Sequence, residues 1–168
     1  GRRRFATGHQ QGIQQLINSG VIHAGIYYAP GSLKAVLCRR GLEATVRFCS
    51  DHQLPFEQCG KLLVATSPLE EDRLAALTSR ARQNGLNVRP VPGAELRKLE
   101  PNIAGRAGLL SPASGIADYA AIVRKMAELF TSAGGEITHN TDVTGINETA
   151  NDVNLTLSNG QRLKTSRL

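Results

Sequence analysis

Three segments with clear helix boundaries alternate with short apolar runs, and this alternation constrains the fold more than any other feature. The second segment has the sharpest boundaries. Ser67 can cap it, Pro68 suits its first turn, and the pair Asn84–Gly85 predicts its end. No apolar run approaches the roughly 18 residues of a membrane-spanning helix. The pattern predicts an α+β fold, with mixed or antiparallel sheet and flanking helices.

The other two helices are predicted over residues 32–54 and 118–133. Ser32 can cap the first and Pro55 ends it, while Asp118 is best interpreted as the N-cap of the last helix. We expect the second helix to bury Leu74, Leu77 and Ala81. Helical spacing predicts buried faces formed by Leu33, Leu37, Thr45 and Phe48 in the first helix and by Ile122, Met126, Leu129 and Phe130 in the last.

Between and after these helices the sequence favours short strands. Apolar runs predict strands within 58–67, 86–91 and 107–112, with a short helix over 93–100. Residues 136–168 alternate apolar and polar side chains, with turn residues in "NETAND" and "SNG". This tail is predicted to be an antiparallel meander. The β-branched and aromatic content of residues 19–28 favours extended structure, and residues 1–17 suggest an irregular or poorly ordered end.

Charge and composition narrow the classes of partner. The net charge is +6, but basic residues are scattered and only seven residues are Phe or Tyr, so stacking on nucleic-acid bases is not expected. A basic surface would instead attract small anionic substrates. Three cysteines without CxxC spacing predict buried, reduced thiols in a cytoplasmic protein, and the four histidines are too dispersed for a zinc site.

The segment "NSGVIHAGIYYAPGSLKA", residues 18–35, has the composition of a binding-site wall. Its first eleven residues combine two glycines, a histidine and two adjacent tyrosines in a chain with few aromatic residues. Gly20 and Gly25 lack a Cβ atom, so their backbone N–H groups can approach a ligand closely. The alternative is that these glycines only form a turn.

Five sequence words, in this order and spacing, resemble L-2-hydroxyglutarate oxidases and dehydrogenases: "NSGVIHAGIYY", "PGSLKA", "CGKLLVAT", "LEPNIAG" and "SGIADY". These enzymes belong to the D-amino-acid-oxidase-like group of FAD-dependent oxidoreductases. The resemblance implies FAD as cofactor and oxidation of L-2-hydroxyglutarate to 2-oxoglutarate by hydride transfer to the flavin. A related flavin oxidase that acts on an amino acid or another 2-hydroxy acid is the alternative.

The chain also departs from the pattern of that family. It contains no G-x-G-x-x-G, the turn that holds the FAD pyrophosphate. The family word resembling "HQTG-x-NSG" has extra residues here, so roles carry over from Asn18 onward and not to residues 9–12. We therefore expect an internal fragment of a two-domain enzyme that alone is inactive, does not bind FAD and can self-associate through uncovered apolar surface.

The resemblance also implies different roles for three parts of the chain. Residues 1–31 would face the FAD site, residues 32–135 would mainly form the substrate domain, and residues 136–168 would belong to the FAD domain. The partner of the intact enzyme is a small 2-hydroxy acid. Electrons would pass to oxygen or to a quinone, the latter through a peripheral link to the inner membrane.

Residues near the flavin follow from the same resemblance. Residues 18–25 would pass beside the flavin ring and pyrophosphate, so the cofactor-binding candidates are Asn18, Ser19, Gly20, Val21 and Gly25. Val143 matches a strand whose backbone contacts the adenine of FAD, although an ordinary strand valine is equally consistent. His23 is the leading catalytic candidate, since imidazole suits removal of a hydroxyl proton. A flavin contact and a purely structural histidine remain alternatives.

Tyr27 and Tyr28 complete the catalytic candidates, because a phenol can donate a hydrogen bond to a substrate carboxylate. In an extended segment they would point to opposite faces, so at most one would face the flavin. Either could instead be an interfacial core tyrosine. Lys34 could supply a positive charge, but a solvated helix residue is the simpler interpretation.

Overall fold

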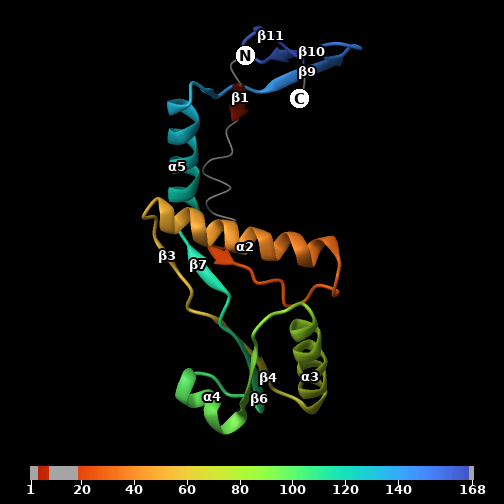
Figure 1. Cartoon of the computed structure of the whole chain (residues 1–168), viewed down its shortest axis with the longest axis vertical. Coiled ribbons are helices and arrows are strands. Elements are labelled where there is room, and N and C mark those ends of the chain that lie inside the picture. Colours follow the sequence, from red (N-terminus) through yellow and green to blue (C-terminus); the bar gives the residue numbers. More distant parts are fainter. Residues whose placement is uncertain (1–3, 8–18, 167–168) are drawn as a thin grey trace. The chain divides into compact units, whose positions relative to one another are not determined.

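The computed structural model describes residues 4–7 and 19–166 and confirms the α+β class. The chain divides into two compact units, one formed by Ser19–Asp118 and the other by Gly1–Asn18 with Tyr119–Leu168. Both combine helix with short strands (Figure 1). The predicted boundaries at residues 31 and 135 separate parts of the chain by expected role, the binding of FAD or of substrate. This assignment of roles stays a prediction.

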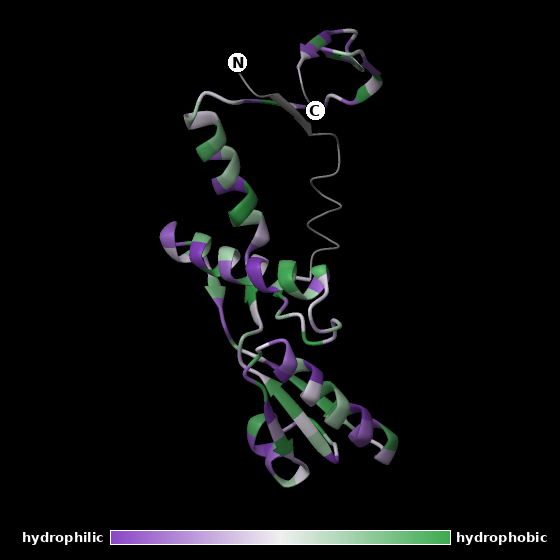
Figure 2. Cartoon of the chain, turned by 45° about the vertical axis from the view of Figure 1, so that its right-hand side comes forward, coloured by the Kyte–Doolittle hydropathy of each residue, from purple (hydrophilic) through white to green (hydrophobic). Residues whose placement is uncertain are grey.

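The larger unit contains a three-stranded antiparallel sheet in the order β4-β6-β5. Its strands are β4 (Lys61–Ala65), β6 (Ala107–Ser111) and β5 (Arg89–Pro92), and all three were predicted. β4 and β6 are predominantly apolar, whereas helix α3 (Pro68–Gln83) alternates apolar and polar residues along its length (Figure 2). The predicted short helix is α4 (Gly93–Leu99).

The core of this unit joins α3 and the sheet to the segment around residue 25. Its buried residues come from four separate parts of the sequence. The predicted apolar face of α3 is confirmed, since Leu74 and Leu77 pack against this core and Ala81 belongs to it. The buried core residues are Ala24, Ile26, Ala81, Val88 and Leu109.

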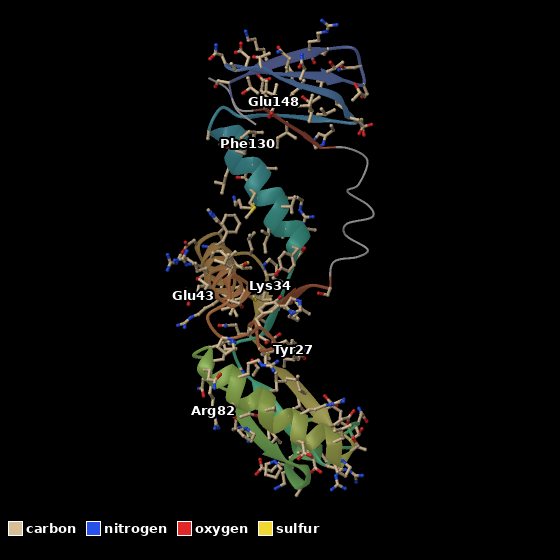
Figure 3. All side chains as sticks on the ribbon, turned by 90° about the vertical axis from the view of Figure 1, so that its right-hand side faces the viewer. Tyr27, Lys34, Glu43, Arg82, Phe130 and Glu148 are labelled. Carbon is tan, nitrogen blue, oxygen red and sulfur yellow. The ribbon has the colours of Figure 1, made fainter. Side chains whose placement is uncertain are left out.

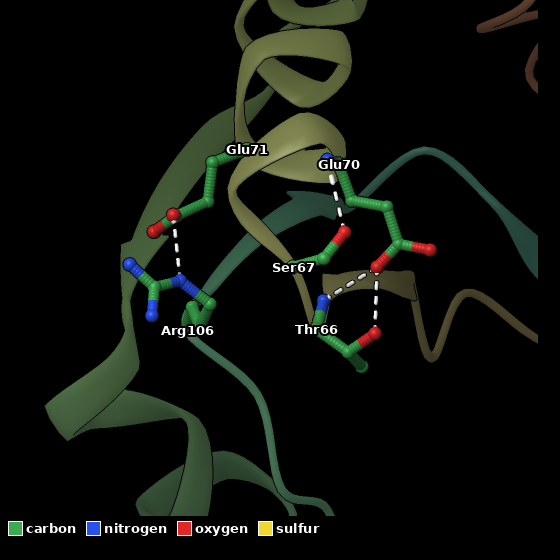
Figure 4. Close-up of polar contacts among 5 residues, drawn as sticks. All are labelled: Thr66, Ser67, Glu70, Glu71 and Arg106. Atoms are coloured by element: carbon green, nitrogen blue, oxygen red, sulfur yellow. Dashed lines mark hydrogen bonds and ion pairs between the residues drawn. The ribbon is translucent and has the colours of Figure 1, made fainter.

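Helix α3 begins where its sequence predicts, at a capped first turn (Figure 4). Ser67 Oγ accepts a hydrogen bond from the Glu70 N–H at 3.4 Å. The Glu70 carboxylate accepts from the N–H and hydroxyl of Thr66, at 2.6 and 2.7 Å, which lowers the pKa of Glu70. Glu71 forms an ion pair with Arg106 at 2.7 Å, fastening the start of the helix to the loop before β6.

A second small sheet in this unit has the order β2-β7-β3 and is antiparallel. It consists of β2 (Val21–Ile22), β7 (Gly115–Ala117) and β3 (Phe56–Glu57). The extended structure predicted for residues 19–28 is therefore regular strand only at Val21 and Ile22. The reason is the turn that follows at Gly25, described below.

Helix α2 (Leu33–Asp51) begins at the predicted Ser32 cap. Thr45 and Phe48 of its predicted apolar face are half-buried, but the prediction is wrong for the two leucines. Leu33 and Leu37 are 77% and 59% exposed. The less exposed face follows helical spacing, and the Cys38 side chain on it would lie 3.3 Å from a Cβ added at Gly25. Its members are Ala35, Cys38, Leu42, Thr45 and Cys49.

In its described part, the smaller unit contains α5 (Tyr119–Ser132) and five short strands. β8 (Glu136–His139) pairs in parallel with β1 (Arg4–Thr7), a pairing that the sequence pattern did not predict. β9 (Val143–Glu148), β10 (Val153–Leu157) and β11 (Arg162–Thr165) form the predicted antiparallel meander.

The predicted buried face of α5 is largely wrong. Ile122 is buried, but Met126 and Leu129 are 51% and 39% exposed, and Phe130 is half-buried. Helical spacing predicts which side chains share a face, but it cannot tell how much of that face is covered. Among the described helices, none combines the length and the apolar character that crossing a bilayer would require.

Candidate active site

Residues 22–27 alternate between the core and the surface. Ile22, Ala24 and Ile26 are only 2%, 4% and 3% exposed, whereas the side chains of His23 and Tyr27 lie on the outside. Over residues 22–24 this is the period of two expected for an extended chain, and the turn that begins at Gly25 returns Ile26 to the core. The buried side chains anchor the segment, so that His23 and Tyr27 are presented on a supported backbone.

The chain turns sharply immediately after this extended part. The Tyr28 N–H donates to the Gly25 carbonyl at 3.3 Å, and Gly25 has a φ of +81°. An added Cβ at Gly25 would lie 3.3 Å from atoms of Cys38 and Tyr28, so this position needs glycine for both conformation and space. The Cys38 thiol donates to the His23 carbonyl at 3.3 Å, and burial raises its pKa.

The turn brings both tyrosines to one small pocket. His23, Gly25, Tyr27 and Tyr28 line it together with Lys61 of β4 and Ser114, which directly precedes β7. The expectation that adjacent tyrosines point to opposite faces assumed an extended backbone, whereas Tyr27 and Tyr28 belong to a turn. Which of them would face the flavin stays a prediction. The cavity volume is about 30 Å³, enough for only one or two water molecules.

Three long-range hydrogen bonds hold the turn, and no sequence pattern indicated them. Arg80 Nη1 of α3 donates to the Tyr27 carbonyl at 3.4 Å. Asn84 Nδ2 donates to the Tyr28 carbonyl at 2.9 Å. Lys61 Nζ of β4 donates to the Tyr27 hydroxyl at 3.3 Å. In the view of Figure 3, Tyr27 lies between α2 and α3.

Lys61 and Ser114 are the pocket residues that the sequence pattern missed. Lys61 was interpreted only as part of the start of a strand, although it belongs to the word "CGKLLVAT" that carries the resemblance. Ser114 is buried, with its hydroxyl 3.5 Å from that of Ser111. No local pattern marks these residues as parts of a site, because each meets residues 23–28 only through tertiary folding.

The proposed cofactor-binding residues are distributed as follows. Ser19 Oγ accepts from the Val21 N–H at 3.4 Å, and the Gly20 carbonyl accepts from the Ala117 N–H at 2.8 Å. Val143 belongs to the other compact unit, at the first position of β9, and is 41% exposed. Their contacts with FAD stay predictions.

The remaining candidates from the sequence lie elsewhere. Asn18 and residues 9–12 lie outside the described residues. Lys34 is an exposed residue of α2, as the simpler interpretation requires. The three cysteines are free thiols, but only Cys49 is buried, and Cys59 is exposed contrary to the prediction. Across the described ranges, no cluster of His, Cys, Asp and Glu could hold a metal ion.

Two backbone N–H groups of residues 22–27 lack a hydrogen-bond acceptor among the described residues. Within the part of the chain that the structure describes, the N–H groups of Ala24 and Ile26 have no acceptor, although both side chains are buried. Ordered backbone N–H groups normally have a partner in the protein, in water or in a ligand. The N–H groups and the outward-facing His23 therefore fit a ligand with several acceptor atoms, as a flavin has.

Comparison with known families gives a match over nearly the whole chain. Residues 16–166 match the family described as FAD dependent oxidoreductase (DAO). The L-2-hydroxyglutarate dehydrogenase of Escherichia coli K12 is 46% identical over 162 residues, which are 96% of this chain and 36% of that protein. The human mitochondrial L-2-hydroxyglutarate dehydrogenase is 41% identical over 83% of this chain and 29% of its own length. The chain thus spans about a third of these relatives.

Solved structures give the same fold. The L-α-glycerophosphate oxidase of Mycoplasma pneumoniae, determined with FAD bound, has a TM-score of 0.79 and 26% identity. The match covers 87% of this chain and 40% of that oxidase. The glycine oxidase of Geobacillus kaustophilus matches with a TM-score of 0.75 over 95% of this chain and 46% of its own, at 20% identity.

Proposed function

Because the chain belongs to the FAD-dependent oxidoreductase family, we propose that the protein containing it oxidises L-2-hydroxyglutarate to 2-oxoglutarate. The observation that carries this proposal is the 46% identity, over 96% of the chain, to an L-2-hydroxyglutarate dehydrogenase. The pocket is consistent with it, since the lining residues include a histidine, two tyrosines and a lysine. The +6 net charge favours an anionic substrate.

His23 is proposed as the base that removes the proton from the C2 hydroxyl of the substrate. FAD, when bound, supplies the acceptor for the hydride that leaves C2. The His23 side chain is exposed in the pocket wall, and the described residues offer its imidazole no hydrogen-bond partner. A neutral imidazole there is free to accept a proton. The hydroxyl groups of Tyr27 and Tyr28 would orient the substrate by donating to its carboxylate.

Cofactor binding is proposed for residues on both sides of Ile22. Asn18, Ser19, Gly20, Val21 and Gly25 would hold the flavin and pyrophosphate, and the backbone of Val143 would contact the adenine. Among the described residues, the absence of acceptors for the N–H groups of Ala24 and Ile26 supports a ligand on this segment. The 168-residue chain alone contains no G-x-G-x-x-G, so its purified form is expected to be colourless.

The test uses the holoenzyme, meaning the protein that contains these residues, loaded with FAD. It is assayed with L-2-hydroxyglutarate, other 2-hydroxy acids and amino acids, with product identification and with oxygen or a quinone as acceptor. We expect 2-oxoglutarate from L-2-hydroxyglutarate at the highest kcat/KM. A higher kcat/KM for an amino acid would contradict the proposal and favour the related-oxidase alternative.

His23→Asn tests the base separately. Loss of a general base lowers kcat about 100- to 10,000-fold, and the rise of kcat with pH that reports deprotonation of His23 disappears. His52→Asn is the matched control, because His52 lies at the C-terminal end of α2 and stacks on Phe48 with ring centroids 4.5 Å apart. An unchanged pH profile in His23→Asn would remove the base role.

A further inference from the structure

We propose that Lys61 binds a carboxylate of the substrate together with the hydroxyl of Tyr27. This inference rests on the proposed oxidation of a 2-hydroxy acid and adds a residue that determines specificity. Lys61 stands at the start of β4, opposite Ser111 of β6, and lines the same pocket as His23 and the two tyrosines. Its sequence neighbours Cys59 and Gly60 suggest nothing beyond the beginning of a strand.

Lys61 Nζ and the Tyr27 hydroxyl keep hydrogen-bond donors that have no acceptor among the described residues. Lys61 Nζ gives one proton to Tyr27 Oη at 3.3 Å and lies 5.1 Å from the centre of the Tyr27 ring. An ammonium group has two further protons, and a phenol oxygen that accepts a bond can still donate its own proton. A carboxylate only accepts hydrogen bonds, so it complements this pair of groups.

Within the described part of the chain, no acidic side chain compensates the charge of Lys61. No carboxylate among residues 4–7 and 19–166 forms an ion pair with Lys61, whereas other basic residues such as Arg39, Arg89 and Arg106 do have acidic partners. Lys61 is half-buried, which strengthens its interaction with an anion relative to that of a fully exposed lysine. The alternative is that Lys61 only fastens β4 to the turn at residues 25–28 through Tyr27.

The supports of the pocket keep these donors in place. Arg80 and Asn84 hold the carbonyls of Tyr27 and Tyr28, and the core side chains of Ala24 and Ile26 anchor the backbone before the turn. Lys61 itself extends from a strand of the β4-β6-β5 sheet. The pair is therefore preorganised, which reduces the ordering that a bound carboxylate would require.

The experiment measures steady-state kinetics of the holoenzyme with Lys61→Met, which keeps the aliphatic stem and removes the charge. KM for L-2-hydroxyglutarate should rise about 10- to 100-fold, as expected when a charged hydrogen bond to a carboxylate is lost. The inhibition constant of glutarate, a dicarboxylate without a hydroxyl to oxidise, should rise by a similar factor. Lys61→Arg should restore most of both values.

A substrate that lacks the distal carboxylate then shows which carboxylate Lys61 binds. If KM for L-2-hydroxybutyrate is unchanged in Lys61→Met, the group bound is the distal carboxylate; if it rises equally, the group is the one beside the hydroxyl. Both results support the proposal. Lys98→Met, on the exposed end of α4, is the control for loss of one positive charge and should leave KM and the glutarate constant unchanged.

Two results would overturn the inference. One is an unchanged KM and glutarate constant in a folded Lys61→Met enzyme with bound FAD. The other is a loss in thermal stability that Lys61→Arg does not repair, with unchanged affinity in the folded fraction, as expected for a structural contact with Tyr27. A wild-type holoenzyme that does not oxidise L-2-hydroxyglutarate would instead refute the proposed function, whereas the glutarate comparison would still test carboxylate binding.

Discussion

The unit Ser19–Asp118 and the meander β9-β10-β11 are built from contacts of very different sequence range. In the first, Lys61 meets Tyr27 across 34 positions and Asn84 meets Tyr28 across 56. In the meander, Thr149 bonds to Asp152 and Asn159 to Gln161, two or three positions apart. The candidate site lies where the long-range contacts are, and the best predicted topology lies where the contacts are local.

The two regions also differ in how fully they bury their strands. Leu109 of β6 is fully buried, whereas Ile146 of β9 is 60% exposed. A buried strand residue constrains the packing of the side chains around it, because protein interiors are closely packed. We therefore expect substitutions to have larger and more distant consequences in the first region, and four pairs of variants compare them.

The largest difference is expected between Leu109→Ala and Ile146→Ala. Leu109 belongs to the core with Ala81 and Val88, so its truncation should lower the free energy of unfolding by about 2–5 kcal/mol. Ile146→Ala should lower it by less than about 0.5 kcal/mol, because the side chain is mostly exposed. Urea unfolding followed by circular dichroism measures both, and equal losses would contradict the comparison.

Strand glycines provide the second pair, Gly115→Ala in β7 and Gly145→Ala in β9. An added Cβ at Gly115 would lie 2.5 Å from the Glu57 carbonyl oxygen, a backbone atom that cannot move alone. At Gly145 the nearest atoms belong to Thr156 at 3.6 Å, an ordinary contact. We expect a loss of about 1–3 kcal/mol for the first and little change for the second. Hydrogen exchange of the amides in each sheet distinguishes them, and rapid exchange only in the β9 sheet would be the opposite result.

The third pair, Asn84→Ala and Asn159→Ala, compares the loss of a long-range hydrogen bond with the loss of a local one. Each removes one side-chain hydrogen bond of 2.9 Å, worth about 1 kcal/mol. Loss of the Asn84 bond should shift the NMR signals of Tyr28 and its neighbours in the pocket wall. Loss of the Asn159 bond should shift only residues of its own hairpin. Unchanged Tyr28 signals in Asn84→Ala would show that Arg80 and the core suffice to hold the turn.

The smallest effect is expected from Glu70→Gln, with Glu148→Gln of β9 as its partner. Bonds from Thr66 lower the pKa of Glu70 in the folded chain, so its ionised form stabilises the fold above the ordinary carboxyl pKa. That contribution is lost as the pH falls through the lowered pKa. Wild type and Glu148→Gln should therefore lose more stability between about pH 5 and 3 than Glu70→Gln does, as measured by urea midpoints. Parallel pH profiles would contradict this role of Glu70.

Sequence patterns predicted most elements of the fold because their signals are local. The Ser67–Pro68 start of α3, the Ser32 cap of α2 and the turns of the meander each depend on residues within a few positions. The apolar faces were less predictable. Spacing on α2 favoured Leu33 and Leu37, but the close approach of Gly25 selected the face with Cys38. The parallel β1–β8 pairing also joins segments too far apart for a local signal.

Several multi-residue words in the sequence were enough to indicate the family and to single out His23, Tyr27 and Tyr28 as catalytic candidates. That both tyrosines line one pocket, and that Lys61 meets them there, follows from the folded chain alone. The physical reason is that a positive-φ glycine turns the chain at residue 25, and three side chains supplied by a distant helix and strand then hold that turn. Neither the partners nor their distances are written in the residues next to the tyrosines.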